Sequence, residues 1–312
     1  MNVIFYVEQD WAFGRIHTDL SKYLFQYGIN AHFLDWTKIY QRDEIYHLNK
    51  IFDAWVTTPH GWKGLSSYDV GVEPEKMIVV SHSKLDIHEP YDALKDMYSR
   101  FYSYGAVSNW IIEESKNKGI EREPILCPLG IDYKTFKLDI SRKLERIGFA
   151  SSFNRRNEIC RGHDAAEKAF GMRVKRGYLA EDIAERTDLE LKIAKQHSSN
   201  FATMPAFYKS VDSILITSTH EGAGLPMLEA GAAGKLVMST SVGHFEERVG
   251  DKGAIRLPMG ETELVDYATD VLNFYKRNSH IYMNKCFQIQ EHAESYDWKY
   301  VIKNWLKLFT RE

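Results

Sequence analysis

Short apolar runs that alternate with helical patterns constrain the fold of this 312-residue chain more than any other feature. In the first half, helical patterns lie near 16–27 and 110–118. Runs rich in β-branched and aromatic residues fall at 3–7, 31–34, 54–57, 77–80, 105–108 and 124–127. Such alternation predicts an α/β fold with a mainly parallel sheet covered by helices.

The alternation begins again after a polar, charged stretch at 137–146. Two doubly wound, Rossmann-like halves in tandem predict a ligand cleft between the carboxyl ends of two sheets. The final stretch, 298–309, has the apolar spacing of an amphipathic helix that packs either on the second half or back on the first. The second half predicts strands at 146–150, 173–178, 213–217, 235–239 and 254–257, and helices near 163–170, 205–210, 226–233 and 262–276.

Composition and charge narrow the class of protein. A net charge of −3 disfavours nonspecific adhesion to nucleic acid or to an anionic membrane. Cys127, Cys160 and Cys286 lie far apart, which predicts reduced thiols in a cytoplasmic protein. The first residues lack the pattern of a signal peptide, and no window approaches the about 18 apolar residues that span a bilayer. Peripheral contact with a membrane stays open.

The segment from Glu221 to Glu229 reads Glu-Gly-Ala-Gly-Leu-Pro-Met-Leu-Glu and carries the strongest functional signal. Its glycines allow close approach of a ligand, and Pro226 suits the first turn of a helix. A helix N-terminus after a glycine turn favours a phosphate. A dinucleotide fingerprint would need a third glycine and a Walker loop would need Gly-Lys-Ser/Thr, so neither fits. The structural alternative is a glycine turn with two solvated glutamates.

Residues 221–237 resemble the motif Glu-Gly-Phe-Gly-Leu-Pro-x-x-Glu-Ala-x-Ala-x-Gly-x-Pro-Val of the family-four retaining glycosyltransferases. Ala223 replaces the usual Phe and Leu236 the usual Pro. Further similar segments extend the resemblance over most of the chain, at 105–115, 127–136, 161–170 and 296–298. The resemblance implies a GT-B fold of two Rossmann-like domains facing across a cleft. The expected parts are a first domain at 1–138, a second at 139–295, and a C-terminal helix at 296–312 that returns to the first.

The resemblance also implies roles in binding a nucleotide-sugar donor. Glu229 would hold the ribose hydroxyls, and Glu221 would face the donor sugar as a catalytic residue. The base would lie against the loop after 173–178, at Gly177 or Tyr178. Backbone amides of the turn would meet sugar hydroxyls and phosphate at Gly222, Ala223, Gly224 and Leu225.

Basic residues are expected to replace a metal, because the sequence has no Asp-x-Asp motif. Arg161 matches a basic residue of the family through its Gly162 neighbour and is expected to be catalytic. Either Arg155 or Arg156 would contact the pyrophosphate, and the sequence leaves that choice open. No metal site or cofactor is expected.

In the first domain, Gly14 and Arg15 occupy the place of the glycine loop that approaches the donor phosphate in this family, although the usual Gly-Gly pair is missing. His82 ends a predicted strand, near the place where members of this family have a histidine that contacts the donor sugar. The resemblance therefore implies a catalytic role for His82. His60 at another strand end is the competing candidate.

The predicted function is that of a retaining, metal-independent hexosyl- or pentosyltransferase acting on an unidentified hydroxyl acceptor in a glycan, a glycolipid or a small molecule. A different acceptor, a modified nucleic-acid base, would need an electropositive groove. Two further functions stay open, those of an epimerase-like enzyme and of a non-catalytic subunit that binds a nucleotide sugar.

Overall fold

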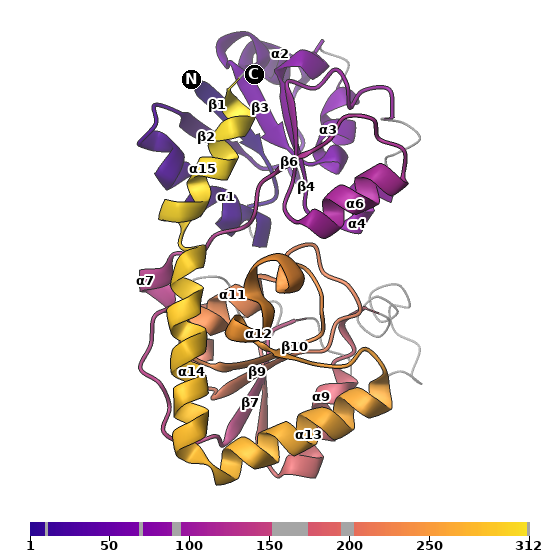
Figure 1. Cartoon of the computed structure of the whole chain (residues 1–312). Helices are drawn as coiled ribbons and strands as arrows, with labels where there is room; N and C mark the ends of the chain where they lie inside the picture. Colours follow the sequence, from indigo (N-terminus) through magenta and orange to yellow (C-terminus); the bar gives the residue numbers. More distant parts are fainter. Residues whose placement is uncertain (10–11, 69–70, 89–94, 152–173, 195–202, 311–312) are drawn as a thin grey trace. The chain divides into compact units, whose positions relative to one another are not determined.

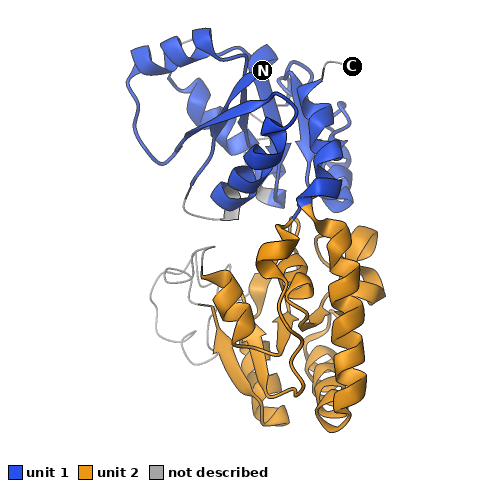
Figure 2. Ribbon diagram, turned by 90° about the vertical axis from the view of Figure 1, so that its left-hand side faces the viewer, with its two compact units in different colours: residues 1–130, 298–312 blue, residues 131–297 orange. Residues whose placement is uncertain are grey.

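A computed structural model describes all residues except 10–11, 69–70, 89–94, 152–173, 195–202 and 311–312. It divides into one unit of Met1–Gly130 with Trp298–Glu312, called unit 1, and a second unit of Ile131–Asp297, called unit 2 (Figure 2). Each unit has a parallel sheet with covering helices, so the predicted α/β class with two Rossmann-like domains is confirmed (Figure 1).

Unit 1 is built on a parallel sheet whose described strands run in the order β2-β1-β3-β4-β5-β6. Its central strands are buried on both faces, and this explains why they read as continuous apolar runs. The strands are β1 (Asn2–Tyr6), β2 (Asn30–Leu34), β3 (Ala54–Thr57), β4 (Met77–Ser81), β5 (Ser103–Ala106) and β6 (Ile125–Leu126). The predicted strands of the first half therefore all form, with shifted ends.

Two helices of unit 1, α3 and α6, begin where a side chain accepts from one of their first amides. Ser108 Oγ accepts from Ile111 N at 3.4 Å, and Thr58 Oγ1 accepts from Gly61 N at 3.1 Å. The main described helices are α1 (Ala12–Phe25), α2 (Arg42–Ile51), α3 (Pro59–Ser66), α4 (Lys84–His88), α6 (Asn109–Asn117) and α15 (Trp298–Leu306).

The last helix, α15, belongs to unit 1 and not to the unit that precedes it in the chain. It packs against α1 (Figure 1). Trp305 Nε1 donates to Pro128 O at 2.9 Å. Gly130 at the unit boundary is required, since a Cβ there would approach Trp298 Cδ2 to 2.5 Å. The chain therefore passes between the units at 130/131 and 297/298, whereas the expected boundaries were 138/139 and 295/296.

Unit 2 has a parallel sheet whose described strands run in the order β11-β10-β9-β7-β8. These strands are β7 (Arg146–Phe149), β8 (Glu190–Ile193), β9 (Ser213–Ile216), β10 (Leu236–Ser239) and β11 (Ile255–Arg256). Its described α-helices are α7 (Tyr133–Phe136), α9 (Tyr178–Thr187), α10 (Met204–Lys209), α11 (Leu225–Ala232), α12 (Gly250–Gly253), α13 (Glu261–Arg277) and α14 (Ser279–Ala293).

The predicted strand at 173–178 is wrong over its described part, 174–178. Val174 and Lys175 have π-helical conformation, Arg176 has a left-handed φ of 50°, and Tyr178 begins α9. The strand beside β7 is instead β8, whose residues are half-buried or exposed because it lies at the sheet edge. An edge strand has no continuous apolar run, so the sequence pattern pointed to the wrong segment. The predicted helix at 163–170 lies outside the described residues.

One long helix of unit 2, α14, was not predicted. Tyr282, Cys286, Ile289 and Ala293 are buried along one of its faces at helical spacing. It packs closely on α11, where a Cβ added at Gly231 would meet Ala293 Cβ at 3.3 Å. The helix thus supports the element that carries Glu229. Among the described residues, no helix is both long and apolar enough to cross a membrane.

Candidate functional site

The strand order of unit 2 makes the carboxyl ends of β7 and β9 a candidate ligand site. β8, the next described strand after β7, lies on one side of β7 in the sheet, and β9 lies on its other side. The direction in which successive strands are added therefore reverses between β7 and β9, which is a topological switch point. Ligands of open α/β sheets bind outside the carboxyl ends of strands at such a switch point. The loop 217–224, which follows β9 and leads into α11, lies at this switch point.

Glycine conformations shape the turn that begins α11. Gly224 has a φ of 79° and immediately precedes the helix, which begins at Leu225, one residue before the predicted Pro226. Gly243, with a φ of 58°, lies so close that an added Cβ would be 2.5 Å from Ala223 O. His244 N donates to the same carbonyl at 3.1 Å. The turn is therefore held by backbone contacts that other residue types would disrupt.

Glu229 lies one turn inside α11 and is only 4% exposed. Tyr208 OH, from α10, donates to Glu229 Oε2 at 2.8 Å, and the Tyr208 side chain is itself fully buried. The Tyr208 hydroxyl therefore orients the Glu229 carboxylate from the adjacent helix. The sequence did not point to Tyr208, because its partner lies 21 residues away and no motif joins them.

Glu221 is paired with a cation that was not predicted. Lys175 Nζ donates to Glu221 Oε1 at 2.6 Å, and Ser218 Oγ donates to the same oxygen at 2.7 Å. The Lys175 and Glu221 side chains are 14% and 16% exposed. The pair places a positive and a negative charge beside the glycine turn. Lys175 was missed because it fell inside the wrongly predicted strand.

Arg176 fixes the segment that carries Lys175. Its Nε donates to Thr217 O at 2.6 Å and its Nη1 donates to Met259 O at 2.7 Å. Thr217 Oγ1 in turn donates to Lys175 O at 2.7 Å. Burial lowers the pKa of Arg176, which is 4% exposed. Arg176 thus acts as a positioning residue that ties the start of α9 to the end of β9.

Tyr178 is the first residue of α9, and Gly177 precedes the helix. Tyr178 OH donates to Glu261 Oε1 at 2.5 Å, at the beginning of α13. The loop position that suggested Tyr178 as a contact for the base is therefore a helix start. Its role stays a prediction, as do the roles of Arg155, Arg156 and Arg161, which lie outside the described residues.

The candidate residues of unit 1 follow the carboxyl ends of strands in its sheet. Gly14 and Arg15 are in the first turn of α1, which follows β1. A Cβ at Gly14 would overlap the carbonyl of Gln9, so the backbone there approaches too closely for a side chain. Arg15 is 8% exposed, and its Nε lies 3.6 Å from Asp19 Oδ2. Packing within unit 1 therefore accounts for the glycine, and the contacts of both residues with a donor stay predictions.

His82 directly follows β4 and packs among aromatic rings. Its ring centroid lies 5.6 Å from that of His17 and 6.4 Å from that of Trp305. Burial, with a smaller contribution from the His17 charge, lowers the pKa of His82 well below its ordinary value. The imidazole is therefore neutral near pH 7. The competing candidate His60 lies in α3 and is half-buried.

The backbone beside His82 is fixed by a buried carboxylate. The amides of His82 and Ser83 both donate to Asp86 Oδ2 at 2.8 Å. Burial raises the pKa of Asp86 to about 6, against these hydrogen bonds, which favour the charged form. The end of β4 is thus held by contacts within four residues.

A stability profile tests the neutral state of His82. Because its pKa is lower in the folded protein, the unfolded chain takes up a proton first as the pH falls through about 6.5. The folding stability that His82 contributes is therefore present above that pH and lost below it, by about 1.4 kcal/mol per pH unit. Urea unfolding of wild type and His82→Phe between pH 5 and 8 measures this difference. A constant difference across that range would contradict it.

Within the described part of the chain, no group of three or more His, Cys, Asp or Glu side chains is arranged to hold a metal ion.

The chain is similar to known proteins in sequence and in fold. Residues 176–274 match the model of the family described as Glycosyl transferases group 1. This segment contains the glycine turn, Glu221 and Glu229, and begins at Arg176. No curated protein sequence matches the chain.

Solved structures resemble the chain over nearly its whole length. Sucrose-phosphate synthase from Thermosynechococcus elongatus is 12% identical, with 99% of this chain and 98% of that one covered at a TM-score of 0.68. Anabaena HepE in complex with UDP and glucose is 15% identical, with 99% of both chains covered at 0.67. A glycosyltransferase from Rickettsia africae is 14% identical, with 99% and 97% covered at 0.61. The chain therefore has the two-domain fold of the GT-B glycosyltransferases, and its second unit carries a segment that matches the glycosyl transferases group 1.

Proposed function

We propose that the protein is a retaining, metal-independent glycosyltransferase that moves a sugar from a nucleoside-diphosphate sugar to a hydroxyl acceptor. One observation carries the proposal. Two glutamates flank a glycine turn at the switch point of the unit 2 sheet, inside the segment that matches the group 1 family. A nucleotide sugar has hydroxyl groups, which carboxylates bind by accepting hydrogen bonds. It also has phosphates, which a helix N-terminus favours.

In this proposal Glu229 binds the ribose. Tyr208 OH orients its buried carboxylate, whose oxygens would accept from vicinal ribose hydroxyls. The amides that begin α11 face the phosphates. A uridine diphosphate donor is the first to consider, because HepE, which has a similar fold, was solved with UDP and with UDP-glucose.

Lys175 and Glu221 would act on the reacting end of the donor. The bond between the anomeric carbon and the β-phosphate oxygen breaks, and the acceptor oxygen bonds to the same face of that carbon. The acceptor proton passes to the departing phosphate. Negative charge grows on the pyrophosphate and positive charge on the sugar, so a cation and a carboxylate side by side stabilise both. The pair at 2.6 Å supplies these two charges.

A panel of UDP-, GDP-, ADP- and dTDP-sugars tests the donor assignment. We expect one nucleotide to raise the melting temperature saturably, and transfer to exceed hydrolysis once an acceptor is supplied. NMR of the product would show the anomeric configuration of the donor retained. Glu263→Gln, on the surface of α13, is the control and should respond as wild type does. The absence of saturable stabilisation by every donor would overturn the proposal.

Removing the cation should weaken the reaction. Lys175→Met keeps the length of the side chain but takes away the charge beside Glu221, so we expect kcat/KM to fall about tenfold to 100-fold, as for loss of one charge-assisted hydrogen bond. Lys192→Met on β8 is the control and should keep wild-type activity. Initial rates over a range of donor concentrations measure both. Equal rates in Lys175→Met and wild type would exclude a role for this lysine.

Chelation tests the metal-independent part of the proposal. If basic side chains alone neutralise the departing pyrophosphate, treatment with EDTA followed by buffer exchange should leave the transfer rate within about twofold of the untreated enzyme. The rate is measured again after adding Mg²⁺ or Mn²⁺. A large loss on chelation that either ion restores would show that the reaction requires a metal.

A further inference from the structure

A cavity opens at the amino ends of the strands in the unit 2 sheet, the end opposite the β9–α11 turn. It has a volume of about 790 Å³, within the size range of small-molecule sites. Arg146 begins β7, Asp212 precedes β9 and Lys235 precedes β10, so the cavity lies at the amino ends of these parallel strands. The lining residues are Lys137, Leu138, Asp139, Ile140, Ser141, Arg146, Lys209, Asp212, Lys235, Phe287 and Gln290. The β9–α11 turn, by contrast, follows a carboxyl end.

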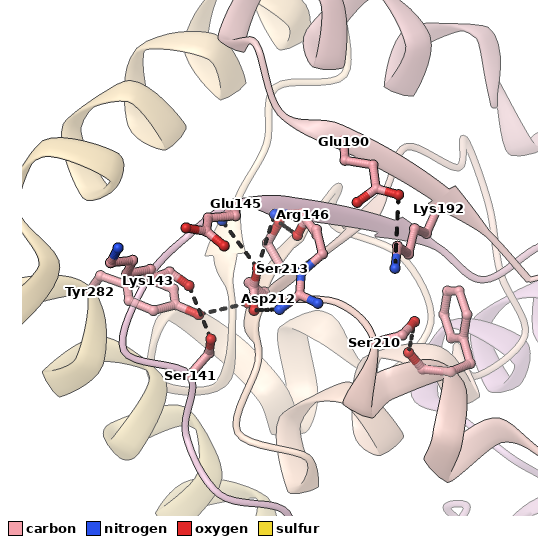
Figure 3. Close-up of polar contacts among 11 residues, drawn as sticks. Ser141, Lys143, Glu145, Arg146, Glu190, Lys192, Ser210, Asp212, Ser213 and Tyr282 are labelled. Atoms are coloured by element: carbon pink, nitrogen blue, oxygen red, sulfur yellow. Dashed lines mark hydrogen bonds and ion pairs between the residues drawn. The ribbon is translucent and has the colours of Figure 1, made fainter.

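The carboxylate of Asp212 is fully engaged by its neighbours (Figure 3). Arg146 donates to it through Nε at 3.1 Å and through Nη2 at 3.2 Å, one bond to each oxygen. The backbone amides of Glu145 and Arg146 also donate to Oδ2, at 3.1 and 3.0 Å. The charges of Arg146 and Asp212 therefore balance each other in a bidentate pair.

Lys235 leaves a positive charge in excess. The residue is 3% exposed, and among the described residues its ammonium makes no hydrogen bond or ion pair. Burial lowers the pKa of Lys235, although the nearby Asp212 charge opposes the shift. Burying an ammonium without a direct partner is costly, so a partner that binds from outside would be stabilising.

Other lining residues add to this charge and supply an apolar surface. Lys137 and Lys209 are exposed at the rim, and Asp139 is the one rim carboxylate among the described lining residues. With Asp212 balanced by Arg146, the cavity carries three lysines against one carboxylate. Phe287 on α14 is 58% exposed and lines the same cavity.

From this arrangement we infer that the cavity binds a small molecule with a phosphate monoester, whose phosphate contacts Lys235 and Lys209 and whose organic part lies against Phe287. A dianion matches the excess of positive charge, and an aromatic or other apolar body matches the exposed ring. The site lies away from the donor turn and does not depend on the proposed transferase activity.

Titration calorimetry with phenyl phosphate and with inorganic phosphate, at matched ionic strength, tests the site. Phenyl phosphate should bind, and Lys235→Met should weaken it by about tenfold, the loss expected for one charge-assisted hydrogen bond. Lys209→Glu should weaken it at least as much, since it reverses a charge. Lys252→Met, an exposed lysine of α12 outside the cavity, is the control and should bind as wild type does. Phe287→Ala should remove the advantage of phenyl phosphate over inorganic phosphate.

The outcomes separate this site from the donor site. Saturating UDP should leave the Kd for phenyl phosphate unchanged, and binding of UDP is measured independently. Unaltered binding in both lysine variants, displacement by UDP, or no heat beyond that of matched NaCl would each overturn the inference. If Lys235→Met does not fold, the surface variant Lys209→Glu decides the matter alone.

Discussion

Replacing Glu229 with alanine should lower kcat/KM for the nucleotide-sugar donor by at least about 100-fold, the largest kinetic effect expected in this protein. The carboxylate is buried and is held by Tyr208 OH at 2.8 Å, so its loss would remove two charge-assisted hydrogen bonds to the ribose at once. Each such bond contributes about 1.5–3 kcal/mol. Initial rates with the donor identified by the binding panel measure the effect.

Two further variants separate binding from folding. Glu229→Gln keeps the shape of the side chain but not its charge, and should lose nearly as much activity as the alanine variant. Tyr208→Phe removes only the orienting hydroxyl and should lose about tenfold or less, because the carboxylate that contacts the ribose remains. If all three variants retained wild-type kcat/KM while folding normally, Glu229 would have no part in donor binding.

The second large effect concerns stability. Trp305→Ala should destabilise unit 1 by about 3–5 kcal/mol, because it removes a fully buried indole and leaves Pro128 O without its donor. Hydrogen exchange reports each unit separately. We expect amides of β4 and β5 to exchange more than 100-fold faster, while those of β9 and β10 keep their wild-type rates.

The matched control for this variant lies on the same helix. Lys303 is exposed in α15, and Lys303→Ala should leave exchange in both units unchanged. Unaltered exchange in unit 1 of Trp305→Ala would show that the helix contributes little to that core. Equal acceleration in both units would show instead that the two cores unfold together.

The sequence predicted the strands that lie inside each sheet, because strands buried on both faces must be apolar throughout. β3, β4, β9 and β10 each fall within one residue of their expected ends. It missed β8, an edge strand that is half-solvated and carries a mixed pattern. It also omitted α14, although the buried spacing of Tyr282, Cys286 and Ile289 was present to be found.

For the site, a contiguous motif was predictable and contacts between distant segments were not. The turn around Gly224 and the helix after it form close to the expected positions. The partners of the two glutamates, Lys175 and Tyr208, lie 46 and 21 residues away from them in the chain. These partners meet the glutamates only once α10, α11 and the segment before α9 have packed together. No local sequence pattern predicts that packing.

The passage of the chain from unit 1 to unit 2 and back again has a consequence for biosynthesis. Most of unit 1 precedes unit 2 in the sequence, yet Trp305 and Leu308, which are fully buried in the core of unit 1, follow unit 2. Unit 2 is contiguous and is complete before them. Synthesis from the N-terminus would therefore let unit 2 fold while unit 1 still lacks α15 and has an incomplete core.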